Sequence, residues 1–264
     1  MFTNKDLRNL IVPLFIEQFL LMFVGIADTF VVSFSSEADV SGVSLVTSFN
    51  TVLIFLFTAL SSGGAVIIIQ SAINSLGTVV MAASSAAFNI EIITYDILNS
   101  FSQACTTFVG QNFGAGQVDR CKKTLALCLI EGLIALAAAL ALILPFGKQL
   151  LAIFNSDPEV VDTGYIRLVM VMLAHSFSLL YEVMSGYLRG FGISLTPALL
   201  TMLGVCGVRI SWVHWVFPGS RTFRTIMLAY PISLSATAFM IFLALLICRP
   251  ARRFARGERV GDAA

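Results

Sequence analysis

Residues 124–146 read TLALCLIEGLIALAAALALILPF, and Glu131 is the only charged side chain among them. A helix needs about 20 predominantly apolar residues, each rising about 1.5 Å, to cross the hydrocarbon core of a bilayer. The run therefore predicts a membrane-spanning helix. Six further runs of this kind lie at residues 9–33, 43–70, 79–109, 164–187, 195–217 and 225–248. Together the runs indicate a helical bundle embedded in a membrane.

The composition of the whole chain supports the same fold class. The 264 residues are 58% hydrophobic and only 12% charged, and the mean hydropathy is +0.91. A soluble domain carries about 25% charged residues, so this sequence cannot supply a water-exposed surface. We therefore predict an all-α, polytopic transmembrane bundle of seven or eight apolar segments whose side chains contact membrane lipids. The net charge of +1 gives no reason to expect nucleic acid as a partner.

No group of residues in the sequence has the spacing of a catalytic or metal site. The five cysteines stand apart, mostly within apolar runs, at Cys105, Cys121, Cys128, Cys206 and Cys248. Scattered cysteines without a CxxC spacing argue against a zinc site and against a disulfide framework. His175 and His214 are each isolated, and no Ser/His/Asp or Cys/His pair suggests nucleophilic catalysis. We expect neither an enzyme nor a bound metal or cofactor.

Basic residues between the apolar runs predict the orientation of the chain, because lysine and arginine concentrate in short cytoplasmic loops. They flank the first run, occupy a central loop and crowd the C-terminal end, as Lys5, Arg8, Arg120, Lys122, Lys123 and the five arginines of the tail 249–264. We therefore place both termini in the cytoplasm and expect the basic tail to fray into solvent. Seven spans would put the termini on opposite sides, so the front of the chain must be irregular.

We assign the irregularity to residues 43–77, because one continuous helix of that length would measure about 52 Å against a hydrocarbon core of about 30 Å. Gly63 and Gly64 offer a place for a break, since glycine weakens a helix. A short helix at residues 65–76 would then return across the bilayer and give eight segments. That helix would reach only about 18 Å, so it requires a thinned bilayer or a re-entrant turn.

Six stretches resemble the multidrug and toxin extrusion (MATE) family of cation-coupled efflux transporters, and they occur in that family's order. They are IVPLFIEQFLLMFVGIADTFVVS (11–33), SLGTVVMAASSAAFNIE (75–91), VGQNFGAGQVDRCKK (109–123), FNSDPEVV (154–161), SGYLRGFGISLTP (185–197) and WVFPGSRTFRTIMLAYPISL (215–234). The first resembles the opening helix of the family, and the last resembles its final helical hairpin. The stretches cover nearly the whole chain.

The resemblance implies a shortened member of that family, whose members have twelve helices in two lobes. Residues 1–64 resemble the first two helices of the N-lobe, and residues 65–248 resemble the C-lobe, followed by the basic tail 249–264. We expect an internal deletion between these parts, either natural or in the gene model. Such a deletion would explain both the orientation conflict and the overlong segment at residues 43–77.

Asp28 in the first run is the candidate for coupling to a cation, because a carboxylate inside a spanning helix is costly and marks a functional site by default. Glu17 lies eleven residues earlier on nearly the same helix face, so Glu17, Gln18 and Asp28 can form one polar stripe. The resemblance implies that the aspartate at this position couples transport to H⁺ or Na⁺ and that the helix bends at Pro13. The alternatives are a solvated Asp28 at the outer interface and a Pro13 that is merely tolerated near a helix end.

The third apolar run supplies a second group of polar candidates. Asp96, Asn99 and Gln103 recur at helical spacing and form a stripe suited to the wall of a water-filled cavity, and Glu91 lies nearby. Glu182, in the fifth run, is a further candidate for the cavity wall. The competing interpretation is that these side chains form hydrogen bonds between helices and only hold the bundle together.

The family resemblance implies a secondary active transporter of the plasma membrane that exchanges H⁺ or Na⁺ for amphipathic, often cationic drugs. Transport of this kind moves two lobes against each other. This short chain would therefore transport poorly as a monomer, and a homo-oligomer would be needed to rebuild a second lobe. Two alternatives remain, a truncated, non-transporting remnant and a flippase for lipid-linked saccharides of the same superfamily. Few basic residues lie in the middle of the apolar runs, which counts against a flippase because its cavity must hold phosphates.

Overall fold

The computed structural model describes residues 66–255, which all belong to the second of two compact units, Thr58–Ala264, the first being Met1–Phe57. Every element in the described part is a helix, which confirms the predicted all-α class there. After a helix at residues 66–74 the elements are α3 (Thr78–Gly114), α4 (Val118–Ile143), α5 (Gly147–Phe154), α6 (Pro158–Gly190), α7 (Leu195–Thr201), η1 (Met202–Gly207), α8 (Val208–Ser211), η2 (Trp212–Val216), η3 (Phe217–Gly219), α9 (Phe223–Cys248) and α10 (Pro250–Ala255).

Five segments of the described part are long and apolar enough to cross a membrane: α3, α4, α6, the combined segment Leu195–Gly219, and Phe223–Phe254. They coincide with the last five predicted runs. The short helix predicted at residues 65–76 is present at residues 66–74. The first predicted run, most of the second and the proposed break at Gly63 lie outside the described residues and stay predictions.

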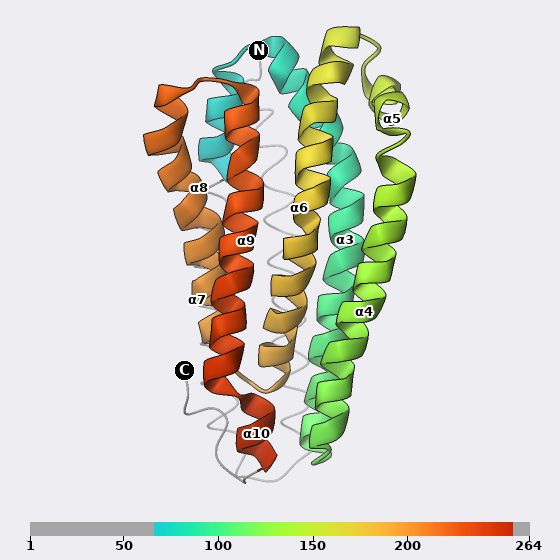
Figure 1. Ribbon diagram of the computed structural model, residues 1–264, viewed down its shortest axis with the longest axis vertical. Helices are drawn as coiled ribbons and strands as arrows, with labels where there is room; N and C mark the ends of the chain where they lie inside the picture. Colours follow the sequence, from blue (N-terminus) through green and yellow to red (C-terminus); the bar gives the residue numbers. More distant parts are fainter. Residues whose placement is uncertain (1–65, 256–264) are drawn as a thin grey trace, which may run out of the picture. The chain divides into compact units, whose positions relative to one another are not determined.

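Helix α6 occupies the middle of this bundle (Figure 1). It packs along α3 on one side and along α9 on the other, while α4 lies beyond α3, and α7 and α8 lie beyond α9. In the most apolar stretch of α6, 61% of the residues are buried and the mean hydropathy is 1.5, whereas the values for α4 are 17% and 2.5. The outer helix is therefore the more apolar one, and the packed helix carries more polar side chains, as expected for a bundle surrounded by lipid.

Glycines on α6 allow its backbone to approach that of α3 closely. The two helices run in the same direction, because α4 returns the chain and the short α5 carries it to the start of α6. A Cβ atom at Gly186 would collide with the Ser102 carbonyl oxygen, and one at Gly190 would lie 2.7 Å from the Val109 Cβ. Small residues at such positions are typical of tightly packed membrane helices.

The connections between helices follow from the residues that the sequence places there. Asp157 caps the start of α6 by accepting a hydrogen bond from the Glu159 backbone N–H at 2.9 Å, and Pro158 fills the first helical position. Residues 115–117 suffice to join α3 to α4, and the glycines at 110 and 114 belong to the last turns of α3. Gly116 has a φ of 74° in this turn, a conformation that glycine adopts without strain.

The span Leu195–Gly219 departs from a regular α-helix. Two π-helical segments, η1 and η2, flank the single turn α8, and the 3-10 turn η3 ends the span. π-helical segments are rare and occur frequently at functional sites. The Trp212 indole N–H of η2 donates to the Thr225 carbonyl oxygen at 2.8 Å, which fixes the outer part of this irregular span against α9.

The C-terminal tail begins as a packed helix, so the prediction that it frays is wrong for its described residues. The ring of Phe254 in α10 lies 4.6 Å from the ring of Phe113 at the end of α3, measured between centroids, and Ala251 is buried. The reason is that apolar side chains alternate with Arg252 and Arg253, so one face of α10 can cover the bundle while the arginines remain at the surface.

Candidate functional site

A polar stripe runs along the exposed side of α3. At about 100° per residue, its members point within about 60° of the direction of Asp96. They are Ser85, Asn89, Asp96, Asn99, Ser100, Gln103 and Thr107, and all are exposed except Asn99, which is half-buried. We call these polar residues the α3 stripe; the exposed apolar side chains of Met81, Ile92 and Ile93 lie in the same sector. In the described part of the chain, the side chains of Asp96, Asn99 and Gln103 make no hydrogen bond.

The α3 stripe is unsuited to contact with lipid. A carboxylate such as that of Asp96, placed in hydrocarbon without a partner, would cost several kcal/mol. The exposed face of α4 is more apolar, since it includes Leu127, Ile130, Leu133 and Ile134, with Glu131 as the single carboxylate among them. The α3 stripe therefore borders water or another part of the protein.

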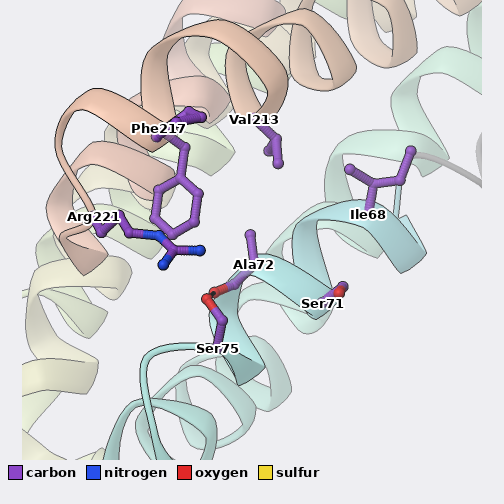
Figure 2. Close-up of a pocket in the computed structure, with 8 residues that line it drawn as sticks. Ile68, Ser71, Ala72, Ser75, Val213, Phe217 and Arg221 are labelled. Carbon is purple, nitrogen blue, oxygen red and sulfur yellow. Dashed lines mark hydrogen bonds between the residues drawn. The ribbon is translucent and has the colours of Figure 1, made fainter.

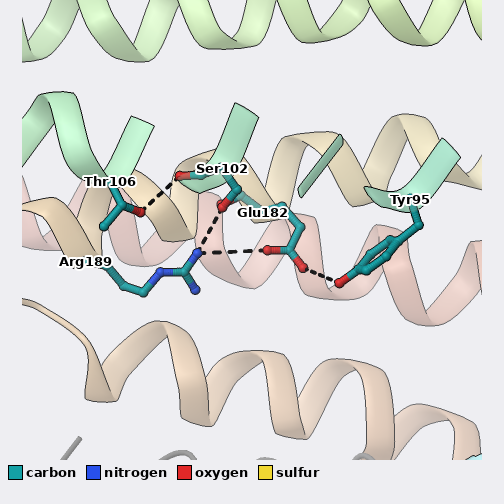
Figure 3. Close-up of polar contacts among 5 residues, drawn as sticks. All are labelled: Tyr95, Ser102, Thr106, Glu182 and Arg189. Atoms are coloured by element: carbon teal, nitrogen blue, oxygen red, sulfur yellow. Dashed lines mark hydrogen bonds and ion pairs between the residues drawn. The ribbon is translucent and has the colours of Figure 1, made fainter. Parts of the chain in front are cut away.

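Glu182 on α6 lies at the edge of the α3 stripe within a network of polar side chains (Figure 3). The Tyr95 hydroxyl donates to its Oε1 at 3.0 Å, and the Arg189 Nη2 lies 4.0 Å from its Oε2. Arg189 donates from Nη2 to the Ser102 Oγ at 2.9 Å, and that hydroxyl donates to the Glu182 carbonyl oxygen at 2.7 Å. The Glu182 side chain is 13% exposed and that of Arg189 is 38% exposed. This long, accessible ion pair leaves the Glu182 carboxylate able to bind a further cation or proton.

A second ion pair joins the same two helices nearer their N-terminal ends, and it is short and enclosed. Arg167 donates from Nε and Nη2 to the two carboxylate oxygens of Glu91 at 2.9 and 2.8 Å, and from Nη1 to the Ser84 Oγ at 2.6 Å. Both charged side chains are 5% exposed. Bidentate geometry satisfies arginine and carboxylate together. The Arg167 guanidinium also lies 5.4 Å from the ring centroid of Tyr230, so the pair links α3, α6 and α9.

His175 lies between these two ion pairs along α6 and is buried. Neither of its ring nitrogens has a hydrogen-bond partner in the described part of the chain, and its ring stands edge-on to that of Tyr95 at 6.3 Å. The buried hydroxyl of Thr94, on the facing helix, likewise has no partner among the described residues. Buried polar groups are normally hydrogen-bonded. The His175 ring nitrogens and the Thr94 hydroxyl are therefore available for further hydrogen bonds at the α3–α6 interface, between Glu91 and Glu182.

Arg209 in α8 is a third basic residue within the spanning segments. It lies about 21 Å along its span from Leu195, near mid-depth. Its Nε donates to the Ser233 Oγ at 3.1 Å, and its guanidinium carbon lies 4.3 Å from the ring centroid of Tyr230. The ring of Tyr230 therefore contacts the guanidinium groups of both Arg167 and Arg209, an arrangement stabilised by cation–π attraction.

The structure separates candidates that the sequence grouped together. Asp96, Asn99 and Gln103 lie on the exposed side of α3 with Glu182 beside them, whereas Glu91 is enclosed by Arg167. Glu91 thus has the interhelical geometry of the competing interpretation. The coupling candidates and the kink candidate lie outside the described residues; they are Asp28, Glu17, Gln18 and Pro13.

Three residues of this region escaped the sequence analysis. Arg167 stands near the start of the predicted run 164–187 and resembles a flanking charge, but α6 begins at Pro158 and carries it into the bundle. Arg209 interrupts an apolar run, and that position was itself a usable signal. Arg167 and Arg209 thus lie within spans of the described part, and the expectation of few mid-membrane basic residues stays a prediction. Nothing in the sequence marked Tyr95 as a partner of Glu182.

The region supplies polar and charged side chains that can contact a ligand. Among residues 66–255, no group of three or more His, Cys, Asp and Glu side chains is arranged to hold a metal ion. The described part is a polytopic bundle of spanning helices. Its α3 stripe is unsuited to lipid and the Glu182 carboxylate is partly exposed, so the spanning region contains a surface that faces water or protein.

Comparison with known proteins identifies the family. The MatE family model matches residues 66–213, more than half of the chain, and the chain belongs to this family of multidrug efflux transporters. A probable multidrug resistance protein NorM of Chromobacterium violaceum is 26% identical over 152 residues, which cover 55% of this chain and 33% of that protein. Multidrug and toxin extrusion protein 1 of Mus musculus is 30% identical over 129 residues, which cover 49% of this chain and 23% of that protein.

Solved structures show the same fold. A MATE transporter in the bent conformation matches 82% of this chain and 48% of its own, with a TM-score of 0.71 and 17% identity. An inward-facing multidrug resistance MATE transporter matches 82% of this chain and 50% of its own, with a TM-score of 0.67 and 18% identity. The chain therefore spans about half the length of these solved transporters, and its matches cover a third or less of the curated relatives above.

Proposed function

We propose that this chain acts in secondary active efflux, exchanging H⁺ or Na⁺ for amphipathic drugs across the plasma membrane. Membership of the MatE family supports this proposal, as do the names of the relatives, which describe multidrug resistance and toxin extrusion. Family members are transporters, and we propose no enzymatic activity, metal or other cofactor for this chain. The observation that carries the proposal is the α3 stripe with Glu182 at its edge.

In this proposal the α3 stripe lines the drug pathway, and Asp96 and Glu182 are its acidic groups. An amphipathic cation would gain from the Asp96 carboxylate, and the amide side chains of Asn99 and Gln103 would orient its polar atoms. Glu182 would exchange its long contact with Arg189 for a proton or Na⁺, because a weak ion pair is easily replaced. Asp28, Glu17 and Gln18 remain the candidates for coupling transport to H⁺ or Na⁺, with a bend at Pro13.

Alternating access requires a second group of helices opposite the α3 stripe. The described residues form one such group, and we propose that a second copy of the chain supplies the facing wall. A homo-oligomer would turn the α3 stripe of one copy toward that of another and would remove the exposed Asp96 from lipid.

We propose an orientation in which the turn between α3 and α4 is cytoplasmic. Basic residues gather at this end of the described helices and at the neighbouring helix ends: Arg120, Lys122, Lys123, Arg189, Arg252 and Arg253. The opposite end carries Lys148, Arg221 and Arg224. An excess of basic residues in short loops on one side supports a cytoplasmic position for that side. The C-terminus, and by the charges of Lys5 and Arg8 the N-terminus, would then be cytoplasmic.

Ethidium efflux from preloaded, energised right-side-out vesicles containing the full chain tests this proposal. We expect ATP-independent efflux that Glu182→Gln and Asp96→Asn each reduce strongly, whereas Glu131→Gln retains it. Glu131 is the matched control because it is an exposed carboxylate at mid-depth of α4, away from the α3 stripe. Equal efflux in all three variants would contradict the assignment of the site. Absence of efflux from the unmodified chain would favour a non-transporting remnant.

A further inference from the structure

A cavity of about 320 Å³ lies at the outer end of the described bundle, between the helix at residues 66–74 and the end of the span Leu195–Gly219 (Figure 2). Ile68, Val213 and Phe217 contribute an apolar wall, and Ser71, Ser75 and Arg221 contribute polar groups. The Arg221 guanidinium extends below the Phe217 ring toward the side of the cavity where Ser75 lies. The cavity is therefore amphipathic, with a cation at its edge.

Arg221 is available for an external ligand. Its guanidinium carbon lies 5.8 Å from the ring centroid of Phe217, and no hydrogen bond or ion pair occupies it in the described part of the chain. The planar guanidinium donates to phosphate oxygens in a bidentate manner, and its stacking on an aromatic ring limits its freedom before a ligand arrives. The Ser75 hydroxyl donates to the Ala72 carbonyl oxygen at 2.7 Å, so of the two serines that line the cavity it is Ser71 whose hydroxyl can donate to a ligand.

The position of the cavity matches the headgroup layer of a bilayer. The spans end here, since α3 starts at Thr78 and η3 ends at Gly219. Trp215, which is 75% exposed, lies in the turn before, and the indole of Trp212 bonds the Thr225 carbonyl oxygen at the same corner. Exposed tryptophans of spanning proteins concentrate at this level of the membrane.

We infer that this cavity binds an anionic phospholipid, whose phosphate contacts Arg221 and whose acyl chain follows Ile68 and Val213. The amphipathic lining fits a ligand that has both parts, which free phosphate does not. Arg221 makes this side of the cavity positive, so a headgroup with net negative charge is favoured over a zwitterionic one. This inference concerns lipid binding alone and stands whether or not the chain transports drugs.

Native mass spectrometry of the purified full chain in detergent, titrated with dioleoylphosphatidylglycerol, tests the inference. We expect Arg221→Gln to weaken binding about fivefold, the effect of roughly 1 kcal/mol for one arginine near an anionic lipid. Arg224→Gln is the matched control, because Arg224 is exposed three residues away and does not line the cavity; it should leave binding nearly unchanged. Equal weakening by both substitutions would show a diffuse surface charge and overturn the inference.

Two further arms distinguish the source of the phosphate and the part played by the cavity. Dioleoylphosphatidylcholine should bind more weakly than the anionic lipid, and millimolar inorganic phosphate should not displace the lipid. Displacement by inorganic phosphate would reassign the site to free phosphate. Ser71→Phe places a ring at the exposed side of the cavity without changing any charge, so it should also weaken lipid binding. Unchanged binding in that variant, with normal elution on size exclusion, would overturn the assignment to the cavity.

Discussion

The two ion pairs between α3 and α6 use the same chemistry with opposite results. Glu91 and Arg167 meet at 2.8 Å with side chains that are 5% exposed, whereas Glu182 and Arg189 are 4.0 Å apart and partly exposed. The first carboxylate has both oxygens occupied by one guanidinium. The second shares its oxygens between a tyrosine hydroxyl and a distant arginine. The same helix interface thus contains one saturated carboxylate and one with spare binding capacity.

We therefore propose that the Glu91–Arg167 pair stabilises the fold and that the Glu182–Arg189 pair opens to let Glu182 bind a proton or cation. Separating a buried, bidentate pair leaves charges that neither lipid nor protein can solvate. A long pair beside the α3 stripe can lose its partner to water, a proton or a cation at little cost. We therefore expect substitutions in the two pairs to affect different measurements, and the following experiments test that separation.

The largest loss of stability is expected for Arg167→Ala, which leaves Glu91 buried without a counter-charge. Removing one member of a buried ion pair costs about 3–5 kcal/mol. Thermal unfolding of the purified chain in detergent, followed by tryptophan fluorescence, should show a marked fall in the midpoint. The control is the double variant Glu91→Leu/Arg167→Met, which removes both charges and should recover most of the loss. A double variant as unstable as Arg167→Ala would show that the charges are not the cause.

Packing at Gly186 tests whether the backbones of α3 and α6 are close together beside the Glu182–Arg189 pair. A Cβ atom at this position would collide with the Ser102 carbonyl oxygen, within the Glu182 network. Gly186→Ala should therefore destabilise the bundle by about 1–3 kcal/mol, the usual cost of overpacking. Gly207→Ala is the control, because an added Cβ there meets nothing within 4 Å and alanine favours a helix. Equal effects of the two substitutions would show that the backbones are not close at Gly186.

Glu182→Gln should separate stability from transport. The amide keeps an oxygen for the Tyr95 hydroxyl, so the free energy of unfolding should change by less than about 1 kcal/mol. Ethidium efflux should fall strongly, because the group proposed to exchange a cation is neutral in the variant. Tyr95→Phe removes the single hydrogen bond and should cost about 1 kcal/mol while leaving the carboxylate in place. A large loss of stability in Glu182→Gln would make Glu182 a structural residue like Glu91.

The fold was largely predictable because lipid imposes a strong and simple pattern. A spanning helix needs a long apolar run, and five of the predicted runs became spans in the described part of the chain. The ends were less predictable: α6 starts at Pro158 rather than near residue 164, because Asp157 caps it outside the apolar run. The packing of α10 depends on Phe254 meeting Phe113, a contact between distant residues that no local pattern contains.

The candidate site was predictable only in part, for a related reason. The spacing of Asp96, Asn99 and Gln103 along one helix indicated a shared face, because helical periodicity is a local property. The distinction between Glu91 and Glu182 depends on which residue of another helix each one meets. Arg167 pairs with a glutamate 76 residues away, and only the tertiary structure brings them together.

The smallest effect is expected at a third ion pair, between Lys148 on α5 and Asp162 on α6, which resembles the first pair in distance and differs in exposure. The atoms lie 2.7 Å apart, but the side chains are 56% and 67% exposed. The hydrogen bond and charge of Asp162 raise the pKa of Lys148, so any stabilisation exists below the pKa of an unfolded lysine and disappears only as pH rises through the raised value. Because both side chains are largely exposed, that stabilisation is small, and Lys148→Gln should leave the unfolding midpoint nearly unchanged at neutral pH. The pH dependence of the unfolding midpoint between about pH 6 and 9, measured by the same thermal scans, should also match that of the unmodified chain. A loss comparable to that of Arg167→Ala would show that distance between charges, rather than burial, determines the strength of ion pairs in this bundle.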